Sequence, residues 1–357
     1  MHKTIAVLPG DGIGPEIVEQ SVRVLKAVEK RFNHEFEYIY GLIGAVSIDS
    51  CGDPYPAITH EICQKADAIL FGAIGDPKYD NNPTAKVRPE QGLLKMRQKL
   101  GLFANIRPVE IYKRLIDRSP LKESIVSGVD LVVVRELTGG IYFGEPRGRS
   151  ENGKIAFDTC VYSTEEVERI ARIAFSMARS RRGIVTLVDK ANVLATSRLW
   201  REVVTALHKN EFSDIKLDFL FVDNAAMQLV TNPSRFDIIL TENMFGDILS
   251  DQASVLTGSI GLLPSSSMGV STPLFEPIHG SFPQGAGKNI ANPIATILSA
   301  AMMLGDVFKL KEESLIVKKG CEEAINNGIL TPELVTDSKA YTTTDVGDYI
   351  VSYILNY

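Results

Sequence analysis

Six short apolar runs that alternate with helical patterns most limit how this chain can fold. Each run is rich in Val, Ile, Leu or Phe, so each predicts a buried β-strand. Strands that alternate with helices favour a largely parallel sheet with helices outside it, and the predicted fold class is α/β. The runs are residues 4–8, 68–73, 129–135, 184–189, 218–222 and 236–240.

Two local patterns predict where helices begin. Pro15 stands where the first position of a helix would fall, and apolar residues follow at helical spacing, so the first strand should turn directly into a helix. Ser163 and Glu166 have the spacing of a capping box ahead of another amphipathic pattern. Residues 138–159, by contrast, are rich in glycine and charge. We interpret them as an excursion from the fold, such as a hairpin arm used for subunit contact.

Size and composition limit the kind of protein. With 357 residues, 45% of them hydrophobic, the chain exceeds the size at which single cores stop growing, so two domains are expected. A net charge of −6 without a basic run argues against nucleic acid as the main partner. No apolar run reaches the length of a membrane-spanning helix or a secretory segment, so we expect a cytoplasmic protein. The cysteines lack the CxxC spacing of zinc and redox sites.

Asp247 and Asp251 form the first candidate site. They come shortly after an apolar run, at the predicted start of a helix, and a separation of four residues places both carboxylates on one helix face. Mg²⁺ prefers oxygen ligands and keeps several waters, so two carboxylates and a substrate's own oxygens would suffice to hold it. The alternative is a solvated acidic face, which the helix dipole favours in a first turn.

Two glycine-rich segments suggest different functions. Residues 10–14 lie between a strand and a helix, but the third glycine comes one position too early for the Rossmann fingerprint, which favours a tight turn instead. Residues 276–292 are the better nucleotide candidate, because such a loop can bring backbone N–H groups against phosphate oxygens. His279 in this loop can stack on an adenine or form a hydrogen bond with it. A mobile loop without a ligand is the alternative.

Polar residues at the ends of apolar runs are candidates for chemistry. Arg135 directly follows three valines, and a buried guanidinium must find an anion, such as a substrate carboxylate. Lys190 and Asp223 end two further runs, and α/β proteins bind ligands at the carboxyl ends of their parallel strands.

Three other residues have both a functional and a structural interpretation. Arg107 and Arg97 can bind carboxylates bidentately, although Arg97 taken alone also fits an exposed helix position. Tyr142 can donate a proton, or it can simply pack beside Phe143.

Several long motifs together resemble the β-decarboxylating dehydrogenases, the family of isocitrate and isopropylmalate dehydrogenases. They occur in order along nearly the whole chain, which makes the set far more specific than any one motif. The motifs are residues 8–16, 101–108, 135–144, 222–227, 241–251 and 287–293.

The resemblance implies a non-Rossmann α/β fold of two open domains with a mixed sheet. Residues 1–102 and 258–357, from both ends of the chain, would form a discontinuous cofactor-binding domain. Residues 103–257 would form the second domain, with the dimer interface and an arm near residues 138–160. The resemblance also implies a homodimer whose active sites are shared between the subunits.

The same resemblance implies a reaction and the residues that perform it. The reaction is NAD-dependent oxidative decarboxylation of a 3-substituted malate, here 3-isopropylmalate in leucine biosynthesis, with Mg²⁺ or Mn²⁺. The implied metal ligands are Asp247 and Asp251 of one subunit and Asp223 of the other, the implied substrate-binding residues are Arg97, Arg107, Arg135 and Asp223, and the implied proton-transfer residues are Tyr142 and Lys190.

The implied NAD site lies on and around the glycine-rich loop. NAD-dependent members usually carry an aspartate at the place of Gln284, where its charge repels the extra phosphate of NADP. Glutamine loses that repulsion, but no Lys, Arg or Tyr takes its place to attract the phosphate, so NAD is predicted. The implied cofactor residues are Glu90, Glu276, His279, Gly280, Ser281, Gln284, Gly285, Ala286, Gly287, Lys288, Asn289 and Asn292.

Substrate choice is expected to depend on the group at C3 of the malate. By analogy, Leu93, Leu94 and Val193 would line an apolar pocket for an isopropyl group. The third carboxylate of isocitrate would lose its hydration there without gaining a partner, at a cost of several kcal/mol. Another 3-substituted malate, or a tartrate, is the alternative substrate. A non-catalytic regulatory subunit is less favoured, because the lysine, the tyrosine and the aspartates are all present.

Overall fold

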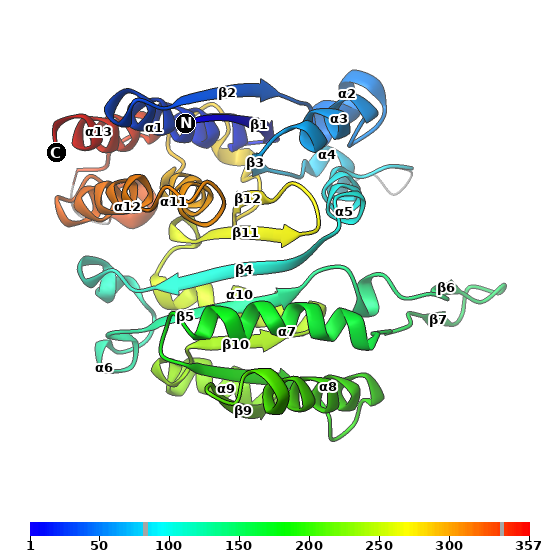
Figure 1. Ribbon diagram of the computed structural model, residues 1–357. Helices are drawn as coiled ribbons and strands as arrows, with labels where there is room; N and C mark the ends of the chain where they lie inside the picture. The colour runs from blue at the N-terminus through cyan, green and yellow to red at the C-terminus, as the bar shows by residue number, and fades with distance from the viewer. Residues whose placement is uncertain (81–84, 336–338) are drawn as a thin grey trace. The chain divides into compact units, whose positions relative to one another are not determined.

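The computed structural model describes residues 1–80, 85–335 and 339–357. The chain divides into two compact units, the first made of Met1–Leu102 and Gly258–Tyr357 and the second of Phe103–Thr257. Each unit consists of β-strands flanked by helices (Figure 1), so the predicted α/β class is confirmed. Within the described ranges, no helix is long and apolar enough to cross a membrane.

The first unit has the strand order β2-β1-β3-β12-β11. Neighbouring strands are parallel except for β11 and β12, which pair antiparallel. Its strands are β1 (His2–Gly10), β2 (Glu35–Tyr40), β3 (Ala68–Ala73), β11 (Pro264–Gly269) and β12 (Leu274–Pro277). Its α-helices are α1 (Gly14–Phe32), α2 (Ala45–Cys51), α3 (Ala57–Lys65), α4 (Pro77–Asp80), α5 (Pro89–Lys99), α11 (Ile294–Met302), α12 (Lys311–Asn326) and α13 (Thr343–Asn356). Shorter helical turns are η5 (Ile260–Leu262), η6 (Pro283–Gly285), η7 (Met303–Val307) and η8 (Pro332–Leu334).

The second unit has the order β4-β5-β10-β8-β9. β5, β10, β8 and β9 are parallel, and β4 pairs antiparallel with β5, so this sheet is also mixed. Its strands are β4 (Leu102–Glu110), β5 (Asp130–Glu136), β8 (Ile184–Asp189), β9 (Lys216–Phe221) and β10 (Ile238–Thr241). Its α-helices are α6 (Glu123–Val126), α7 (Thr164–Ala178), α8 (Ala195–Glu211), α9 (Val222–Thr231) and α10 (Asn243–Ser254). Shorter turns are η1 (Lys113–Arg118), η2 (Gly140–Tyr142), η3 (Pro233–Arg235) and η4 (Val255–Thr257).

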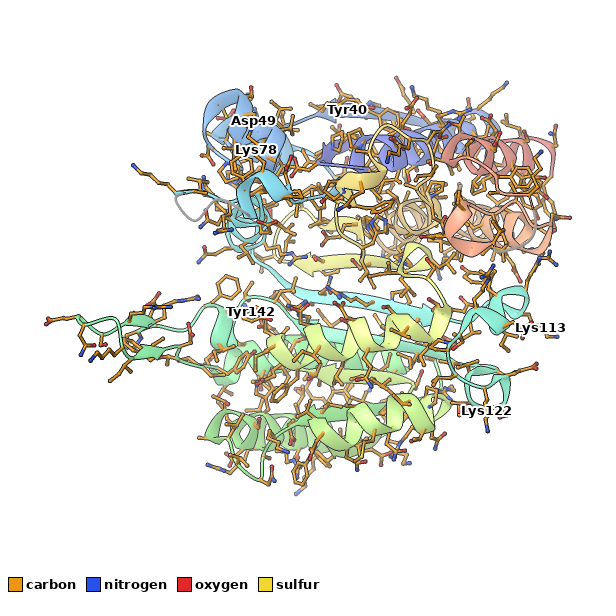
Figure 2. All side chains as sticks on the ribbon, turned by 180° about the vertical axis from the view of Figure 1, so that it is seen from behind. Tyr40, Asp49, Lys78, Lys113, Lys122 and Tyr142 are labelled. Carbon is orange, nitrogen blue, oxygen red and sulfur yellow. The ribbon has the colours of Figure 1, made fainter. Side chains whose placement is uncertain are left out.

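Helices lie on both faces of the second unit's sheet. α7 and α8 cover one face and α9 and α10 the other (Figures 1 and 2). Because β5, β10, β8 and β9 are parallel, their carboxyl ends lie at one edge of the sheet. The residues that follow these strands are therefore gathered at that edge, which is where α/β proteins bind ligands.

Both predicted helix starts are confirmed. α1 begins at Gly14 with a proline in its first positions. Ser163 is the N-cap of α7 and forms the reciprocal capping box with Glu166. The predicted excursion contains a short antiparallel hairpin, β6 (Gly148–Arg149) with β7 (Ala156–Phe157), which projects from the second unit (Figure 1).

Candidate active site

Arg135 lies near the end of β5 and is almost fully buried. Its guanidinium donates to the carboxylate of Asp247 at 2.5 Å and to both the backbone and the side-chain oxygen of Asn243. The expected anion partner is thus a carboxylate of the candidate metal site. Gly246 permits this approach, because a Cβ atom there would lie 2.5 Å from Arg135 Cγ.

Arg107 lies on β4, the strand that pairs with β5, and is also buried. It donates to the side chains of Asn105 at 2.6 Å and Ser250 at 2.7 Å, and it lies 3.3 Å from Asp251. Both aspartates of α10 therefore face arginines on β4 and β5. A shared helix face, predicted from their spacing, is confirmed.

One detail of this prediction is wrong. The helix α10 begins at Asn243, directly after its N-cap Glu242, so Asp247 lies in the second turn and Asp251 in the third. The field of a helix N-terminus falls off within the first turn and does not explain two carboxylates further along. Their partners in this chain are the arginines.

Tyr142 stands at the end of η2, on the segment that leads into the β6–β7 hairpin (Figure 2). Its hydroxyl donates to Asp247 at 3.0 Å, and its ring centroid lies 6.0 Å from the Arg135 guanidinium. Partial burial, followed by the negative charge of Asp247 and the hydrogen bond to it, raises the pKa of Tyr142. The phenol therefore keeps its proton near neutral pH, as a proton donor must.

Lys190 and Asp223 form a second group at the same edge. Lys190 follows β8, Asp223 stands in the first turn of α9, and the ammonium lies 2.9 Å from the carboxylate. Hydrogen bonding to Lys190 holds the pKa of Asp223 below its ordinary value. The preceding residue, Asp189, is buried, and its carboxylate accepts two hydrogen bonds from the guanidinium of Arg201. This ion pair fixes the backbone next to Lys190.

The three expected metal ligands do not meet within one chain. In the ranges that the structure describes, no three His, Cys, Asp or Glu side chains lie close enough to hold one ion. Asp247 and Asp251 are nevertheless suitable ligands, since they supply carboxylate oxygens, which a hard dication prefers, on one helix face. Asp223 pairs with Lys190 instead.

The remaining expected arginine belongs to the first unit. Arg97 on α5 donates to Glu276 on β12 at 2.7 Å, and both side chains are largely buried. An exposed helix position, the alternative for Arg97, is therefore excluded. Glu276, expected beside the cofactor, is the partner of this arginine.

The expected specificity residues have different surroundings. Leu93 is partly buried against the apolar core of the first unit, whereas Leu94 is exposed. Val193, in the second unit, leaves 63% of its surface exposed.

The turn at residues 10–14 packs against the glycine-rich loop. Gly10 and Gly12 have positive φ angles of 70° and 58°, which confirms the predicted tight turn. The backbone N–H of Ile13 donates to the carbonyl of Ser281 at 2.8 Å, and Glu16 accepts from the N–H of Gly287. The turn thus helps to position the loop, and its Ile13 also lines the pocket beside that loop.

A pocket of about 560 Å³ in the first unit opens beside this loop. Burial lowers the pKa of His279, so its imidazole is neutral. Its Nδ1 lies 2.9 Å from the carbonyl of Gly280 and must carry the hydrogen, while no partner for the buried Nε2 occurs among the described residues. The lining residues are Ile13, Ile260, Gly261, His279, Gly280, Phe282, Ile290, Ala291, Asn292, Pro332 and Glu333.

Three of the expected cofactor residues, His279, Gly280 and Asn292, line this pocket. The others lie along the loop or next to it. Gln284 and Gly285 form η6, Gly287 has a positive φ, and Asn289 accepts hydrogen bonds from Thr344. Ser281 is buried, Ala286 and Lys288 are exposed, and the Glu90 carboxylate lies beside Gly75.

Sequence reasoning missed Phe282, Ile260 and Glu333. Phe282 belongs to the recognised loop and its aromatic ring could have been noted. Ile260 and Glu333 carry no local signal, because they reach the pocket from segments distant in sequence.

Comparison with known proteins shows the family to which this chain is related. Residues 4–350 match the model of the family described as isocitrate/isopropylmalate dehydrogenase. The chain is 54% identical to the 3-isopropylmalate dehydrogenase of Geobacillus kaustophilus over 99% of this chain and 96% of the relative. It is 52% identical to the 3-isopropylmalate dehydrogenase of Bacteroides fragilis over 99% of both. The crystal structure of isocitrate dehydrogenase from Methylococcus capsulatus superimposes with a TM-score of 0.88 at 35% identity, covering all of both chains.

Proposed function

This chain belongs to the isocitrate/isopropylmalate dehydrogenase family, and we propose that it oxidises and decarboxylates (2R,3S)-3-isopropylmalate to 4-methyl-2-oxopentanoate and CO₂ with NAD, in leucine biosynthesis. The chain is thus an oxidoreductase. The observation that carries the proposal is the Asp247 carboxylate, which contacts both Arg135 and Tyr142 at the ligand-binding edge of a parallel sheet. That arrangement joins a metal ligand, a carboxylate binder and a proton donor.

Asp247 and Asp251 would hold Mg²⁺ or Mn²⁺ together with Asp223 of the partner subunit. A bound dication supplies Lewis acidity, which favours loss of the 2-hydroxyl proton and stabilises negative charge during decarboxylation. Asp247 and Asp251 now accept hydrogen bonds from Arg135, Arg107 and Tyr142. With these carboxylates used as metal ligands, Arg107 and Arg135 would be available to bind the substrate's carboxylates, together with Arg97.

Two side chains of the second unit would move the protons. Lys190, as the neutral amine, would accept the proton of the 2-hydroxyl while the hydride leaves C2 for the nicotinamide. The bond between C3 and the carboxyl carbon then breaks, CO₂ departs, and the electron pair remains on C3. Tyr142 donates the proton to C3, which the raised pKa of its phenol permits at neutral pH.

A homodimer would complete each active site. Among the described residues of one chain the three expected ligands do not form one group, so a second copy would be needed to bring them together. Exposed apolar side chains on α9 and α10 fit such an interface, with Met227 exposed by 59% and Ile248 by 58%. The projecting β6–β7 hairpin is a further contact for the partner. We place this homodimer in the cytoplasm.

The pocket beside the glycine-rich loop would take the adenosine end of NAD. Its walls are mostly apolar, and His279 offers a neutral ring and an unpartnered acceptor, which suit a base. Leu93, Leu94 and Val193 would surround the isopropyl group and exclude the third carboxylate of isocitrate.

An assay of purified protein tests the function. With Mg²⁺ and NAD, we expect NADH formation from 3-isopropylmalate with a kcat/KM at least about 100-fold above that for isocitrate, because a buried unpaired carboxylate costs several kcal/mol. Preference for another 3-alkylmalate or for a tartrate would change the assigned substrate but not the family. Preference for isocitrate would overturn it.

A further inference from the structure

The adenosine pocket has an uneven charge. Among its described lining residues, Glu333 carries the one ionised side chain, and none is a lysine or an arginine. His279 is neutral, because burial lowers its pKa. A ligand in this pocket therefore meets a negative charge that no cation among the described lining residues balances.

Glu333 is exposed, yet its carboxylate is held in place. Its Oε1 atom accepts from the hydroxyl of Ser259 at 2.8 Å and from the side-chain amide of Asn292 at 3.1 Å. Asn292 is itself buried, and its side-chain oxygen accepts from the N–H of Ile294, the first residue of α11, at 3.0 Å. A Cβ atom added to Gly261 would lie only 2.6 Å from Oε1 of Glu333. The carboxylate therefore packs closely against the pocket wall.

We propose that Glu333 supplies the negative charge by which this chain prefers NAD to NADP, in place of the aspartate that residue 284 lacks. The inference rests on the proposed function, in which this pocket holds the adenosine of the cofactor. NADP differs from NAD by a phosphate on the adenosine ribose. Gln284 can form hydrogen bonds with the ribose but cannot repel that phosphate. Gln284 is not among the residues that line the pocket, whereas the carboxylate-bearing Glu333 is.

The expected size of the effect follows from the charges. A ribose phosphate carries a charge of about −1.5 to −2, and its repulsion from one carboxylate several ångströms away, in partly hydrated surroundings, corresponds to roughly a five- to tenfold difference in affinity. Because Glu333 is exposed, salt should screen much of this difference.

Glu333→Gln tests the proposal, since the amide oxygen can still accept from Ser259 and Asn292 while the charge is lost. Binding of NADH and NADPH is measured by isothermal titration at low salt, without substrate or metal, and the melting temperature reports folding. We expect the ratio of the NADPH Kd to the NADH Kd to fall about five- to tenfold. Placing a new carboxylate on the loop in the same background, by Gln284→Asp, should restore the ratio.

Ser259→Ala is the matched control, because it removes one hydrogen bond to Glu333 and leaves the charge. Its Kd ratio should stay within about twofold of the wild-type ratio. A Glu333→Gln variant whose ratio is unchanged, or that loses affinity for both dinucleotides equally, would overturn the inference while the proposed function stands. A wild-type chain that binds neither dinucleotide would instead refute the proposed cofactor site, and the inference with it.

Discussion

At the scale of single residues, Asp247 is the side chain on which the candidate active site depends most. One of its carboxylate oxygens accepts a hydrogen bond from Arg135, and the other accepts one from Tyr142. The proposed metal ligand therefore contacts both a substrate-binding arginine and the proposed proton donor. A substitution that removes the charge of Asp247 but keeps the shape of the side chain can show whether the residue acts in the reaction or only in folding.

Asp247→Asn should lower the Mg²⁺-dependent kcat/KM at least about 100-fold, which is the usual scale for losing one preorganised electrostatic group. The measurement is NADH formation over a range of Mg²⁺ concentrations, with circular dichroism to show that the fold is kept. Asp49→Asn is a control on an exposed carboxylate of α2 (Figure 2) and should not change turnover. Wild-type turnover that needs no added metal would contradict the assigned role.

Glu242 shows how a buried charge links stability to pH. It is almost fully buried, its Oε2 atom has no partner among the described residues, and burial together with Asp189 and Glu136 raises its pKa to about 7 from 4.5. Between these two pH values the native chain keeps a proton that the unfolded chain has released. Native stability therefore falls as the pH rises from about 4.5 to 7, and the full cost applies above pH 7.

Glu242→Gln should remove that cost. We expect the free energy of unfolding to increase by up to about 3 kcal/mol at pH 8 and by far less at pH 5, where the wild-type side chain is mostly protonated. Urea denaturation of both proteins at one protein concentration, at each pH, measures the difference. An equal effect at both pH values would show that the charge is not the cause.

At the scale of elements, the turn between β1 and α1 controls the neighbouring loop through a close backbone contact. Gly12 has a φ of 58°, and a Cβ on it would lie 2.0 Å from the carbonyl oxygen of Ser281. A side chain at this position must therefore move the loop that lines the pocket.

Gly12→Ala should weaken NADH binding by about tenfold or more, because a misplacement of about 1 Å is enough to spoil a preorganised site. Gly52→Ala is the matched control in the same unit, since its φ of 79° imposes comparable backbone strain but nothing lies within 4 Å of the added Cβ. Isothermal titration of both variants compares the two effects. Equal losses of affinity would assign them to backbone strain rather than to the loop contact.

The elements also show what the sequence could and could not predict. β3 and β10 are buried along their whole length, so their apolar runs were sufficient to predict them. β11 was not predicted, because it contains three buried serines in place of an apolar run. One of them, Ser265, donates a hydrogen bond to the carbonyl of Glu276 instead of facing water. β4 was not predicted, because Arg107 interrupts its apolar run. The partner that stabilises this buried arginine, Ser250, is distant in sequence.

At the scale of the whole molecule, strand order explains why the site residues could be identified from sequence. Arg135, Lys190 and Asp223 follow or end parallel strands, and that position alone predicts a shared edge. Glu333 could not be found in this way, because it approaches the pocket from near the chain's end and meets partners, Ser259 and Asn292, on other segments. Only tertiary structure brings those three together.

The site residues of one chain belong to two groups of strands that are neighbours in the sheet. Arg107, Arg135 and the α10 aspartates belong to β4, β5 and the helix after β10, whereas Lys190 and Asp223 follow β8 and β9. In a twofold-symmetric dimer, one group of each subunit can face the other group of its partner. Two shared sites would then form per dimer.

Complementation between two inactive variants tests this arrangement. If sites are shared, a mixed dimer of Asp223→Asn and Asp247→Asn chains carries both defects in one site and none in the other. Random pairing of equal amounts should then restore about a quarter of wild-type activity, since half of the dimers are mixed and each has one intact site. The two variants are refolded together, with each refolded alone as its control. If each chain instead builds its own site, every site carries a defect and the mixture stays as inactive as the separate variants.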